Sequence, residues 1–537
     1  MQTLVSPKLP ILIVGAGPSG LMLALILAKF GEKVRIIDKD VSINPYSRAI
    51  GVQIRTLEIF KSLGLVQNLR KHALPLSSIK ICNEFGLKFS IRSFYEFSIF
   101  HNPWIVDQSD TQKVLEESLK KLGIEVERGV TLTDFTQEEN KVIASLLNSD
   151  GQAETFHASY LVGADGAHSF VRKKLNHKFS GTSYEDAFIL ADACFEQEIN
   201  SNSASLFLKH KKFLAVLPLA KKNHYRLISV RKNDKNKEGQ EPTKQEFQDL
   251  IKELTNLPAI SSIQWMARFF VRCLSVENYQ KKRVFLIGDA AHIHSPAGGQ
   301  GMNTGLQDAF NLGFKLSMVS SRLAKEKVLS TYHDERKPVG DFLIQNTDKL
   351  FSFIVKNTFF LRIARTLILL FLSIFKIVPS KLMSILSQTN IRYEKGLVCS
   401  SSKHNSISCF SIGKRIYCWQ LKNKQNALVD LHSIVLGLYF SCFIIFPFGS
   451  NLDKIKECKD YARNLFKKFN NTVRLFFVYL DANKQINEND EYIFDNPHKD
   501  LKDQISYVLI RPDQHIFCCD HFVNIEHAKS CLQNFLI

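Results

Sequence analysis

The stretch ILIVGAGPSG, residues 11–20, determines how the first part of this chain folds. It begins with four apolar residues, passes through G-x-G-x-x-G and leads into a helix-patterned segment, Leu21–Lys29. That order of strand, glycine-rich turn and helix is the context in which the motif binds a dinucleotide. Gly15 allows the tight turn, Gly17 lets a pyrophosphate approach the backbone, and Gly20 lets helix and strand pack closely. We therefore expect phosphate at the positively polarised N-terminus of this helix.

A second predicted strand, Lys33–Ile37, ends at Asp38, 18 residues beyond Gly20. A carboxylate at that place can accept hydrogen bonds from an adenosine ribose. The glycines alone would also fit a merely tight turn, but strand, helix and acid in register favour dinucleotide binding. This unit by itself does not separate NAD from FAD.

Two later segments have a similar character. Residues 160–172, YLVGADGAHSFVR, and residues 283–303, RVFLIGDAAHIHSPAGGQGMN, both run from an apolar strand into glycines, and the second leads to a predicted helix at Thr304–Leu316. With residues 11–20, these segments resemble the three fingerprints of the class A FAD-dependent aromatic hydroxylases, which are monooxygenases, in the branch of phenol 2-monooxygenase and the polyketide hydroxylases. The resemblance covers residues 11–316 and implies FAD as the cofactor.

The resemblance also implies individual flavin contacts. Asp289 would accept from ribityl hydroxyls, and the loop Pro296–Asn303 would offer N–H groups to the flavin N1/O2 edge. Asp165 would lie near the pyrophosphate, although capping the following helix is an alternative role for it. The expected FAD-binding residues are Gly15, Gly17, Pro18, Ser19, Gly20, Asp38, Arg48, Gln108, Asp165, Gly288, Asp289, Pro296, Gly299, Gln300, Gly301, Met302 and Asn303.

Several shorter matches support the same frame. In the family, an Arg at the place of Arg48 approaches the pyrophosphate, with a surface ion pair as the alternative, and a Gln at the place of Gln108 contacts the flavin. The acidic helix partner of that Gln is replaced here by Gln112. We expect His292 and His294 to make hydrogen bonds that hold their loop in place, and we assign neither as a catalytic base.

The predicted fold is α/β, with a Rossmann-like FAD-binding domain, an inserted antiparallel β-sheet substrate domain and a C-terminal thioredoxin-like domain. The FAD-binding domain comprises residues 1–180 and 281–390, largely helical after 304, and the substrate sheet comprises residues 181–280. The third domain, residues 391–537, follows from the resemblance. It has no C-x-x-C motif, so we expect it to be structural or dimer-forming and not redox-active.

The resemblance implies a reaction in which NAD(P)H reduces FAD, dioxygen adds at flavin C4a, and the resulting hydroperoxide transfers oxygen to an electron-rich ring. The phenol-specific enzymes carry an Asp and an Arg at the positions where this chain has Ile50 and Leu219. We therefore expect a larger, more apolar substrate, such as a polycyclic phenol, polyketide or quinol. The catalytic residue is unassigned; candidate groups for a base are Tyr225, Arg226, His224 and His101.

The 537 residues carry a formal net charge of +18 but no concentrated basic stripe, so a solvated basic surface is favoured and nucleic-acid binding is not expected. The 11 cysteines form no zinc-type pair in sequence, which predicts reduced thiols, no metal site and a cytoplasmic protein. Expected partners are a small aromatic substrate, NAD(P)H and O2, with a homodimer as a possibility.

Two alternatives remain open at this point. One is a membrane-surface quinol or ubiquinone-type hydroxylase, with the basic apolar segment 359–381 in peripheral contact with lipid. Against it, residues 366–375 are apolar all round, which favours burial. The other is a non-catalytic flavin-binding sensor or partner-binding protein. The choice between NADH and NADPH is also open.

Overall fold

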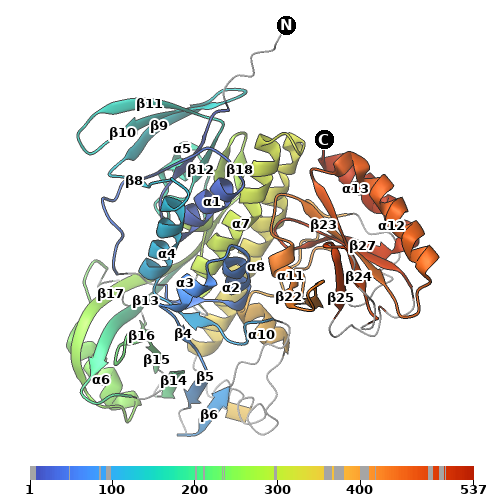
Figure 1. Ribbon diagram of the computed structural model, residues 1–537. Coiled ribbons are helices and arrows are strands. Elements are labelled where there is room, and N and C mark those ends of the chain that lie inside the picture. The colour runs from blue at the N-terminus through green and yellow to red at the C-terminus, as the bar shows by residue number, and fades with distance from the viewer. Residues whose placement is uncertain are drawn as a thin grey trace.

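The protein, seen here in a computed structural model, consists of a large body formed by the first 390 residues and a C-terminal unit beside it (Figure 1). The structure describes residues 8–537 except 47–48, 84–85, 92–97, 200–201, 210–211, 233, 235, 237, 295–298, 356–365, 368–379, 400–409, 418, 482–485, 487, 495–500 and 502–503. Most of segment 359–381, which would contact lipid in the membrane-surface alternative, lies outside the described residues.

A six-stranded sheet lies at the centre of the large body, in the order β18-β19-β12-β1-β2-β8. β19, β12, β1, β2 and β8 run parallel, which brings their carboxyl ends to one edge. The predicted strand at residues 11–14 is confirmed, and all four of its residues are buried, as expected of a parallel strand covered on both faces. The strands are β1 (Ile11–Val14), β2 (Val34–Asp38), β8 (Glu127–Arg128), β12 (Tyr160–Gly163), β18 (Gln280–Lys281) and β19 (Val284–Leu286).

Helices pack around this sheet. α1 is apolar almost all round, and Gly20 to Leu27 within it are buried, so the helix lies wholly inside the body. It packs closely on α7, and the closeness is seen at Gly313, where an added Cβ would lie 2.6 Å from Ile26 Cγ2. These helices are α1 (Pro18–Lys29), α2 (Ile54–Ser62), α3 (Val66–Arg70), α4 (Gln108–Lys120), α5 (Phe170–Lys174), α7 (Gly301–Ser320), α8 (Thr331–Val355) and α10 (Ser380–Leu386).

An eight-stranded sheet, in the order β20-β17-β13-β16-β15-β14-β5-β6, extends below the first one in Figure 1. Three of its strands, β14, β15 and β16, lie within the residues predicted as the substrate sheet, and α6 (Lys244–Leu254), opened by a Thr243–Glu246 capping box, packs on one face. β5 and β6 at one end of this sheet and β20 at the other come from outside residues 181–280. The strands are β5 (Ser78–Cys82), β6 (Lys88–Ile91), β13 (Phe179–Phe195), β14 (Ser203–Lys209), β15 (Lys212–Pro218), β16 (Tyr225–Arg231), β17 (Ile260–Val276) and β20 (His292–Ile293).

Two three-stranded sheets complete the large body. β9 (Thr131–Gln137), β10 (Val142–Leu147) and β11 (Ala153–Ala158) form an antiparallel meander. β3 (Gly51–Val52), β7 (Trp104–Ile105) and β4 (Leu74–Pro75) form a small sheet in the order β3-β7-β4. The small sheet lies between the helices and the eight-stranded sheet (Figure 1).

The C-terminal unit is built on a seven-stranded mixed sheet, β22-β21-β25-β24-β23-β26-β27. β23 is buried at all seven positions: Phe440 and Cys442 face one apolar cluster, while Phe443 and Ile445 face another. The elements are β21 (Gln420–Lys422), β22 (Leu428–Asp430), α11 (Leu431–Ile434), β23 (Phe440–Phe446), α12 (Leu452–Phe466), β24 (Val473–Tyr479), β25 (Glu491–Phe494), β26 (Ser506–Ile510), β27 (Ile516–His521) and α13 (Ile525–Phe535).

Buried charges join the C-terminal unit to the large body. Arg511 donates two hydrogen bonds of 2.8 Å to Glu335 of α8 and two more, of 2.7 and 2.9 Å, to Asp513. Lys315 and Asn311 of α7 donate to the same Glu335 carboxylate, at 2.7 and 2.6 Å. We call these five residues the interface network. Its ionic members are at most 1% exposed, so each charge is compensated by protein and not by water.

One cysteine prediction is wrong. Reduced thiols were expected throughout, but the structure pairs Cys399 with Cys531, whose Cα atoms lie 5.7 Å apart. The two residues are 132 positions apart, so only the tertiary fold brings them together. Seven other described cysteines are free.

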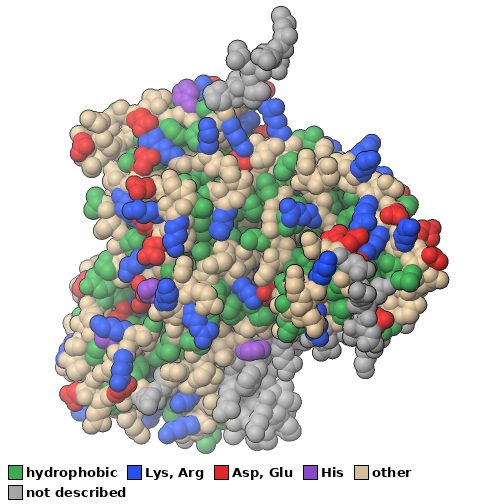
Figure 2. Space-filling view, viewed as in Figure 1, with side chains coloured by type: hydrophobic (Ala, Val, Ile, Leu, Met, Phe, Trp, Pro, Cys, Tyr) green, Lys and Arg blue, Asp and Glu red, His purple; other side chains and the backbone are tan. Residues whose placement is uncertain are grey.

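The described surface shows no concentrated charge on the face drawn in Figure 2, where Lys and Arg side chains are dispersed among acidic and uncharged ones. Among the helices that the structure describes, none combines the length and apolar character needed to cross a membrane.

Candidate functional site

The three glycine-containing segments meet at the carboxyl edge of the six-stranded sheet. Ala164 N–H donates to Val14 O at 2.8 Å, and Ile287 N–H donates to Gly163 O at 3.0 Å. The turns that follow β1, β12 and β19 are therefore adjacent, although they are about 150 and 270 residues apart in the sequence. This is the edge of a parallel sheet where ligands bind in open α/β folds.

The first turn has room for a phosphate at one of its glycines. Gly15 has φ of +104°, and a Cβ there would lie 2.4 Å from Ala164 O, while a Cβ at Gly20 would lie 2.0 Å from Gly15 O. Around the Cβ position of Gly17, in contrast, no atom lies within 4 Å. Gly17 is the N-cap of α1, so the open space lies where helix N–H groups attract anions. The residues present thus fit the pyrophosphate of FAD.

Ser19 joins this turn to the third segment. A Cβ added at Gly305 would lie 2.2 Å from the Ser19 hydroxyl oxygen, and a Cβ added at Gly288 would lie 2.7 Å from it. Pro18 occupies the first turn of α1, where its missing N–H costs no hydrogen bond. The close approach of α1, α7 and the turn after β19 explains why small residues stand at these places.

Asp38 lies at the end of β2, beside the glycine-rich turn. Its carboxylate accepts from Ala16 N–H at 2.6 Å and from Asp40 N–H at 2.9 Å. The side chain is half-buried, so it is held in place while one side remains open to a ligand. The ribose contact of Asp38 stays a prediction.

Asp165 makes hydrogen bonds within its own loop and to the start of the following helix. Its carboxylate accepts from Ser169 Oγ at 2.5 Å and from Val171 N–H at 3.1 Å, and burial raises its pKa. Ser169 is the N-cap of α5. Asp165 accepts from Ser169 and therefore supports the start of this helix, in line with the alternative role of helix capping. Arg172 donates from this helix to Ala290 O at 3.2 Å, which ties the second segment to the third.

A buried ion pair holds the turn that contains Gly288 and Asp289. Asp308 of α7 accepts from Gly288 N–H at 3.1 Å and from Arg336 Nε at 2.7 Å, and His292 Nε2 lies 2.7 Å away. We call Asp308, Arg336 and His292 the flavin-turn network. Burial opposes ionisation of Asp308, but Arg336 and His292 prevail and lower its pKa to about 2. Asp289 itself is exposed at the edge, as an acceptor for a ligand must be.

Hydrogen bonds to neighbouring segments also hold the N-terminus of α7 in place. Asn303 is fully buried; its Oδ1 accepts from Gln53 N–H at 2.8 Å, and its Nδ2 donates to Gly51 O at 2.8 Å and Gly299 O at 3.0 Å. Gln300 O accepts from Gln388 Nε2 at 3.3 Å. The remaining predicted residues here, Gly301 and Met302, form the first turn of α7.

Gln108 begins α4, and its backbone N–H donates to Ala49 O at 3.2 Å. Gln112, one turn later and buried, donates from Nε2 to Ala16 O at 3.2 Å. The residue that replaces the family's acid therefore supports the glycine-rich turn directly. Two predicted contacts, Arg48 and Pro296, lie outside the described residues.

Ile50 and Leu219, which replace charged residues of the phenol-specific enzymes, lie together. Both are buried in one small apolar cluster with Leu76 and Ile105. This cluster joins the small β3-β7-β4 sheet to the eight-stranded sheet. Ile50 and Leu219 thus place apolar side chains at the two positions where the phenol-specific enzymes carry charged residues.

Asp107, which lies next to Gln108, is a polar group that the sequence analysis did not single out, and two charged residues act on it. Arg226 binds Asp192 through two 2.7 Å hydrogen bonds and lies over the Trp265 ring at 5.3 Å. Asp107 is affected by both charges, and burial, the largest effect, raises its pKa. A raised pKa makes this carboxylate a better proton acceptor than an ordinary aspartate. The only sequence signal was Asp107's position beside Gln108.

The other proposed bases lie in different surroundings. Tyr225 donates its hydroxyl proton to Ile199 O, and Arg226 is paired with Asp192. His224 Nδ1 lies 2.8 Å from Lys222 O at a sheet turn. His294, which was not assigned as a base, packs against Gly301, where a Cβ would lie 3.0 Å from its ring. His101 is exposed.

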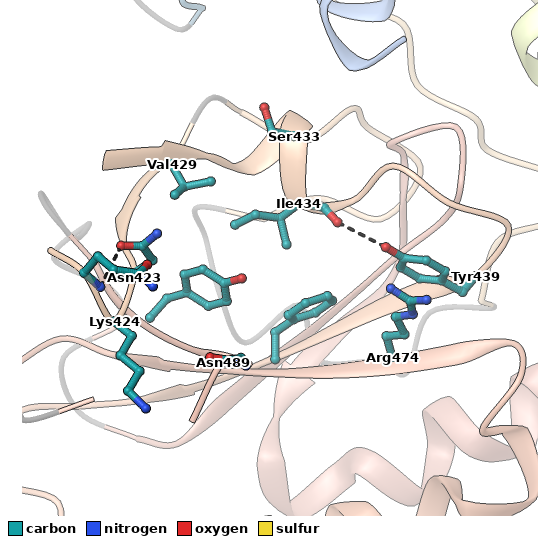
Figure 3. A pocket seen from close by; sticks show the side chains of 11 residues that line it. Asn423, Lys424, Val429, Ser433, Ile434, Tyr439, Arg474 and Asn489 are labelled. Atoms are coloured by element: carbon teal, nitrogen blue, oxygen red, sulfur yellow. Dashed lines mark hydrogen bonds between the residues drawn. The ribbon is translucent and has the colours of Figure 1, made fainter. Parts of the chain in front are cut away.

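A pocket of about 470 Å³ lies in the C-terminal unit (Figure 3). Arg474 lies 4.0 Å above the Tyr439 ring, and the Tyr439 hydroxyl donates to Ile434 O at 3.3 Å. All of its lining residues fall between 423 and 492, so it contains none of the predicted flavin contacts.

Comparison with known proteins supports the flavin site. A family profile described as "FAD binding domain" matches residues 8–347. The pentachlorophenol 4-monooxygenase of Sphingobium chlorophenolicum is 32% identical over 355 residues, 64% of this chain and 65% of that protein. The 6-methylpretetramide 4-monooxygenase of Streptomyces rimosus is 33% identical over 347 residues, 63% of this chain and 60% of that protein. The match therefore spans just under two thirds of each relative.

A solved structure extends the similarity in fold to the whole chain. The anhydrotetracycline hydroxylase of Streptomyces rimosus superposes with a TM-score of 0.76 at 23% identity, covering 98% of this chain and 99% of that one. The C-terminal unit therefore belongs to an arrangement found in that protein too.

Proposed function

Because the chain belongs to the FAD binding domain family, we propose that it is an FAD-dependent monooxygenase that uses NAD(P)H and O2 to hydroxylate an aromatic substrate. The observation that carries the proposal is the open space at Gly17, at the N-terminus of α1, in a turn whose other two glycines are packed against backbone. When bound there, FAD supplies the redox and oxygen chemistry, and the protein supplies binding, orientation and exclusion of water.

Each segment has a role in this proposal. The α1 N-terminus binds the pyrophosphate, Asp38 binds the adenosine ribose, and Asp289 binds the ribityl chain. The first turn of α7, held by Asn303, places backbone N–H groups at the flavin ring. Arg48 and Pro296 remain proposed contacts on the strength of the sequence alone.

The proposed substrate is a large, apolar aromatic compound such as a polycyclic phenol or a polyketide. The buried apolar cluster around Ile50 and Leu219 supports this, because it removes two charges that would orient a small phenol. Asp107 is the proposed proton acceptor, since its pKa is raised and it precedes the flavin-contacting Gln108. The names of the relatives, which act on pentachlorophenol and 6-methylpretetramide, fit an aromatic substrate.

We also propose that residues 391–537 form a thioredoxin-like domain without redox function, and that the chain forms a homodimer. β23 and β24 are parallel and joined by α12, and the β26–β27 hairpin leads into α13. A parallel crossover followed by a hairpin and a helix supports the thioredoxin-like assignment. Sedimentation of the purified protein tests the dimer, which a single monomeric species contradicts.

The direct test of the reaction is a panel of aromatic compounds added to the purified flavoprotein with NADH or NADPH. We expect polycyclic phenols to stimulate coenzyme oxidation and to gain one oxygen atom by mass spectrometry. A yellow protein that oxidises neither coenzyme with any compound contradicts the proposal and favours a sensor.

The site assignment is tested by Asp289→Ala, with Asp150→Ala, an exposed carboxylate in the β10–β11 turn, as matched control. We expect Asp289→Ala to be purified folded with little FAD and Asp150→Ala to keep full occupancy. Full FAD occupancy in Asp289→Ala contradicts the ribityl contact.

A further inference from the structure

Four side chains that bind soft metals lie close together in the C-terminal unit, away from the flavin site. Cys399 follows the connection from the large body, Cys518 lies on β27, and His527 and Cys531 lie on α13. His527 and Cys531 are four residues apart in a helix, so they share one face. All three cysteines are buried, and His527 is half-buried.

The spacing of these atoms matches a single metal centre. His527 Nε2 lies 4.0 Å from Cys399 Sγ and 3.6 Å from Cys531 Sγ. The ligand atoms of Cys399, Cys518 and His527 all lie within 4.8 Å of one another. Around a tetrahedral zinc, sulfur ligands at about 2.3 Å and nitrogen at about 2.0 Å lie roughly 3.5 to 3.8 Å apart. The two distances from His527 Nε2, 4.0 and 3.6 Å, are close to those values, and Cys518 would have to move towards the other three ligands to complete the set.

We propose that these four residues bind one zinc ion when the Cys399–Cys531 pair is reduced. A dithiol reductant supplies two electrons and two protons, which break the disulfide and leave two thiols. Zinc binding then releases the protons of Cys399, Cys518 and Cys531 to solvent as three Zn–S bonds form, and a neutral His527 nitrogen completes a Cys₃His set. The disulfide and the zinc site are two states of the same cluster.

The surroundings support ligand binding. The Tyr507 hydroxyl lies 3.3 Å from Cys518 Sγ, where it can donate to a thiolate. Cys399 is held by its backbone N–H, which donates to Phe517 O at 3.0 Å. Hydrogen bonds of this kind orient metal ligands before the metal arrives.

The site also has a structural consequence. Leu397, two residues before Cys399, donates its N–H to Glu335 at 2.7 Å and accepts from Arg511 at 2.8 Å. A zinc ion at Cys399 would therefore fix the connecting segment to β27 and α13 immediately beside the interface network. We expect metal binding to stabilise the attachment of the C-terminal unit.

The test is the zinc content of the full-length flavoprotein, purified without chelator and with a phosphine reductant, which breaks the disulfide but does not compete for zinc as a dithiol would. We expect one zinc ion per chain in the wild type and in Cys458→Ser, a control that removes a buried thiol of α12 in the same unit. Cys518→Ser and His527→Gln should each hold far less. Cobalt substitution gives a second readout, because three thiolates produce a strong charge-transfer band and tetrahedral d–d bands.

Two results would overturn the site: reduced wild-type protein without stoichiometric zinc or cobalt, or undiminished metal in both Cys518→Ser and His527→Gln. Metal content is measured independently of flavin content and of coenzyme oxidation. Failure of the zinc site is therefore distinguishable from failure of the proposed reaction.

Discussion

Glu335 and Arg336 are neighbours on α8 but belong to two different regions of buried charge. Arg336 binds Asp308 in the flavin-turn network, whose members lie between residues 292 and 336. Glu335 binds Arg511 in the interface network, across 176 positions of sequence. The first network holds a turn within the large body, and the second holds the C-terminal unit against it.

The two regions differ in the titratable groups around them. The interface also contains Arg55, Glu58 and Arg415, with Arg415 Nη1 3.0 Å from Glu58 Oε1, and two buried histidines, His432 and His515. The flavin-turn network contains a single carboxylate between one guanidinium and one imidazole. Breaking each region should therefore give a different loss: domain attachment in one and flavin binding in the other.

The largest expected effect comes from Arg511→Met. It leaves the carboxylates of Glu335 and Asp513 buried without their guanidinium, which typically costs about 3–5 kcal/mol. We expect the free energy of unfolding in urea to fall by that amount while the folded fraction keeps FAD. Exposed Arg322→Met is the control, and a variant as stable as wild type contradicts the role of the interface network.

Mild acid should weaken the interface before the flavin turn. Burial, the main cause, lowers the pKa of His432 and of His515 to about 4. An unfolded histidine binds its proton below about pH 6.5, so between about pH 6.5 and 4 the unfolded state binds more protons and stability falls. At the acidic end each histidine contributes a loss on the order of 3 kcal/mol.

The flavin turn should respond only to stronger acid. The pKa of Asp308 is about 2, so its contribution is complete above about pH 4 and is lost as pH falls from there towards 2. Urea unfolding at pH 7 and pH 4.5, followed by the emission of the three tryptophans, of which Trp419 lies in the C-terminal unit, and by the release of FAD, checks the order. Two results would show that these histidines do not control the pH dependence of stability. One is an equal free energy of unfolding at both pH values. The other is an unchanged difference between the two pH values in the double variant His432→Gln/His515→Gln.

Asp308→Asn should act mainly on the flavin. The amide keeps the shape but loses the charge-assisted bond from Arg336 Nε, worth about 2–3 kcal/mol. It also weakens the acceptor for Gly288 N–H. We expect FAD to dissociate more readily, measured by equilibrium dialysis, with the C-terminal unit still attached. Unchanged FAD affinity contradicts the link between this network and the flavin turn.

The smallest effect on stability is expected from Gly17→Ala. A methyl group there meets nothing within 4 Å, so the free energy of unfolding of the apoprotein should change by less than about 0.5 kcal/mol. The same methyl group would fill the space for the pyrophosphate, so FAD affinity should fall at least tenfold. Gly20→Ala, whose Cβ would lie 2.0 Å from Gly15 O, should instead destabilise the apoprotein itself.

The parts of this protein that sequence reasoning found are those with local signals. The β1–α1 turn and the helix predicted at Thr304–Leu316, which lies within α7, have periodicity or glycine spacing that can be read along the chain. The interface network could not be found in that way. Glu335 and Arg511 lie 176 positions apart, and no spacing along the chain predicts that they pair.

The same reasoning explains what was missed at the site. Gln112 looked like a departure from the family pattern, and only the structure shows its amide on Ala16 O. The Asp192–Arg226 pair joins facing strands, and its registry depends on the sheet. The Cys399–Cys531 pair required two elements 132 residues apart to meet.

The strand order of the six-stranded sheet has a consequence for biosynthesis. β1 lies between β2 and β12, and β12 also pairs with β19, which ends at residue 286. At about 5–20 residues per second, a ribosome needs roughly 15 to 60 s to reach that point. We expect the nascent chain to expose one edge of β1 until β12 has been made, then an edge of β12 until β19 has been made, and to acquire flavin only afterwards. The seven-stranded sheet uses only residues 420–521, so it can close soon after its last strand emerges.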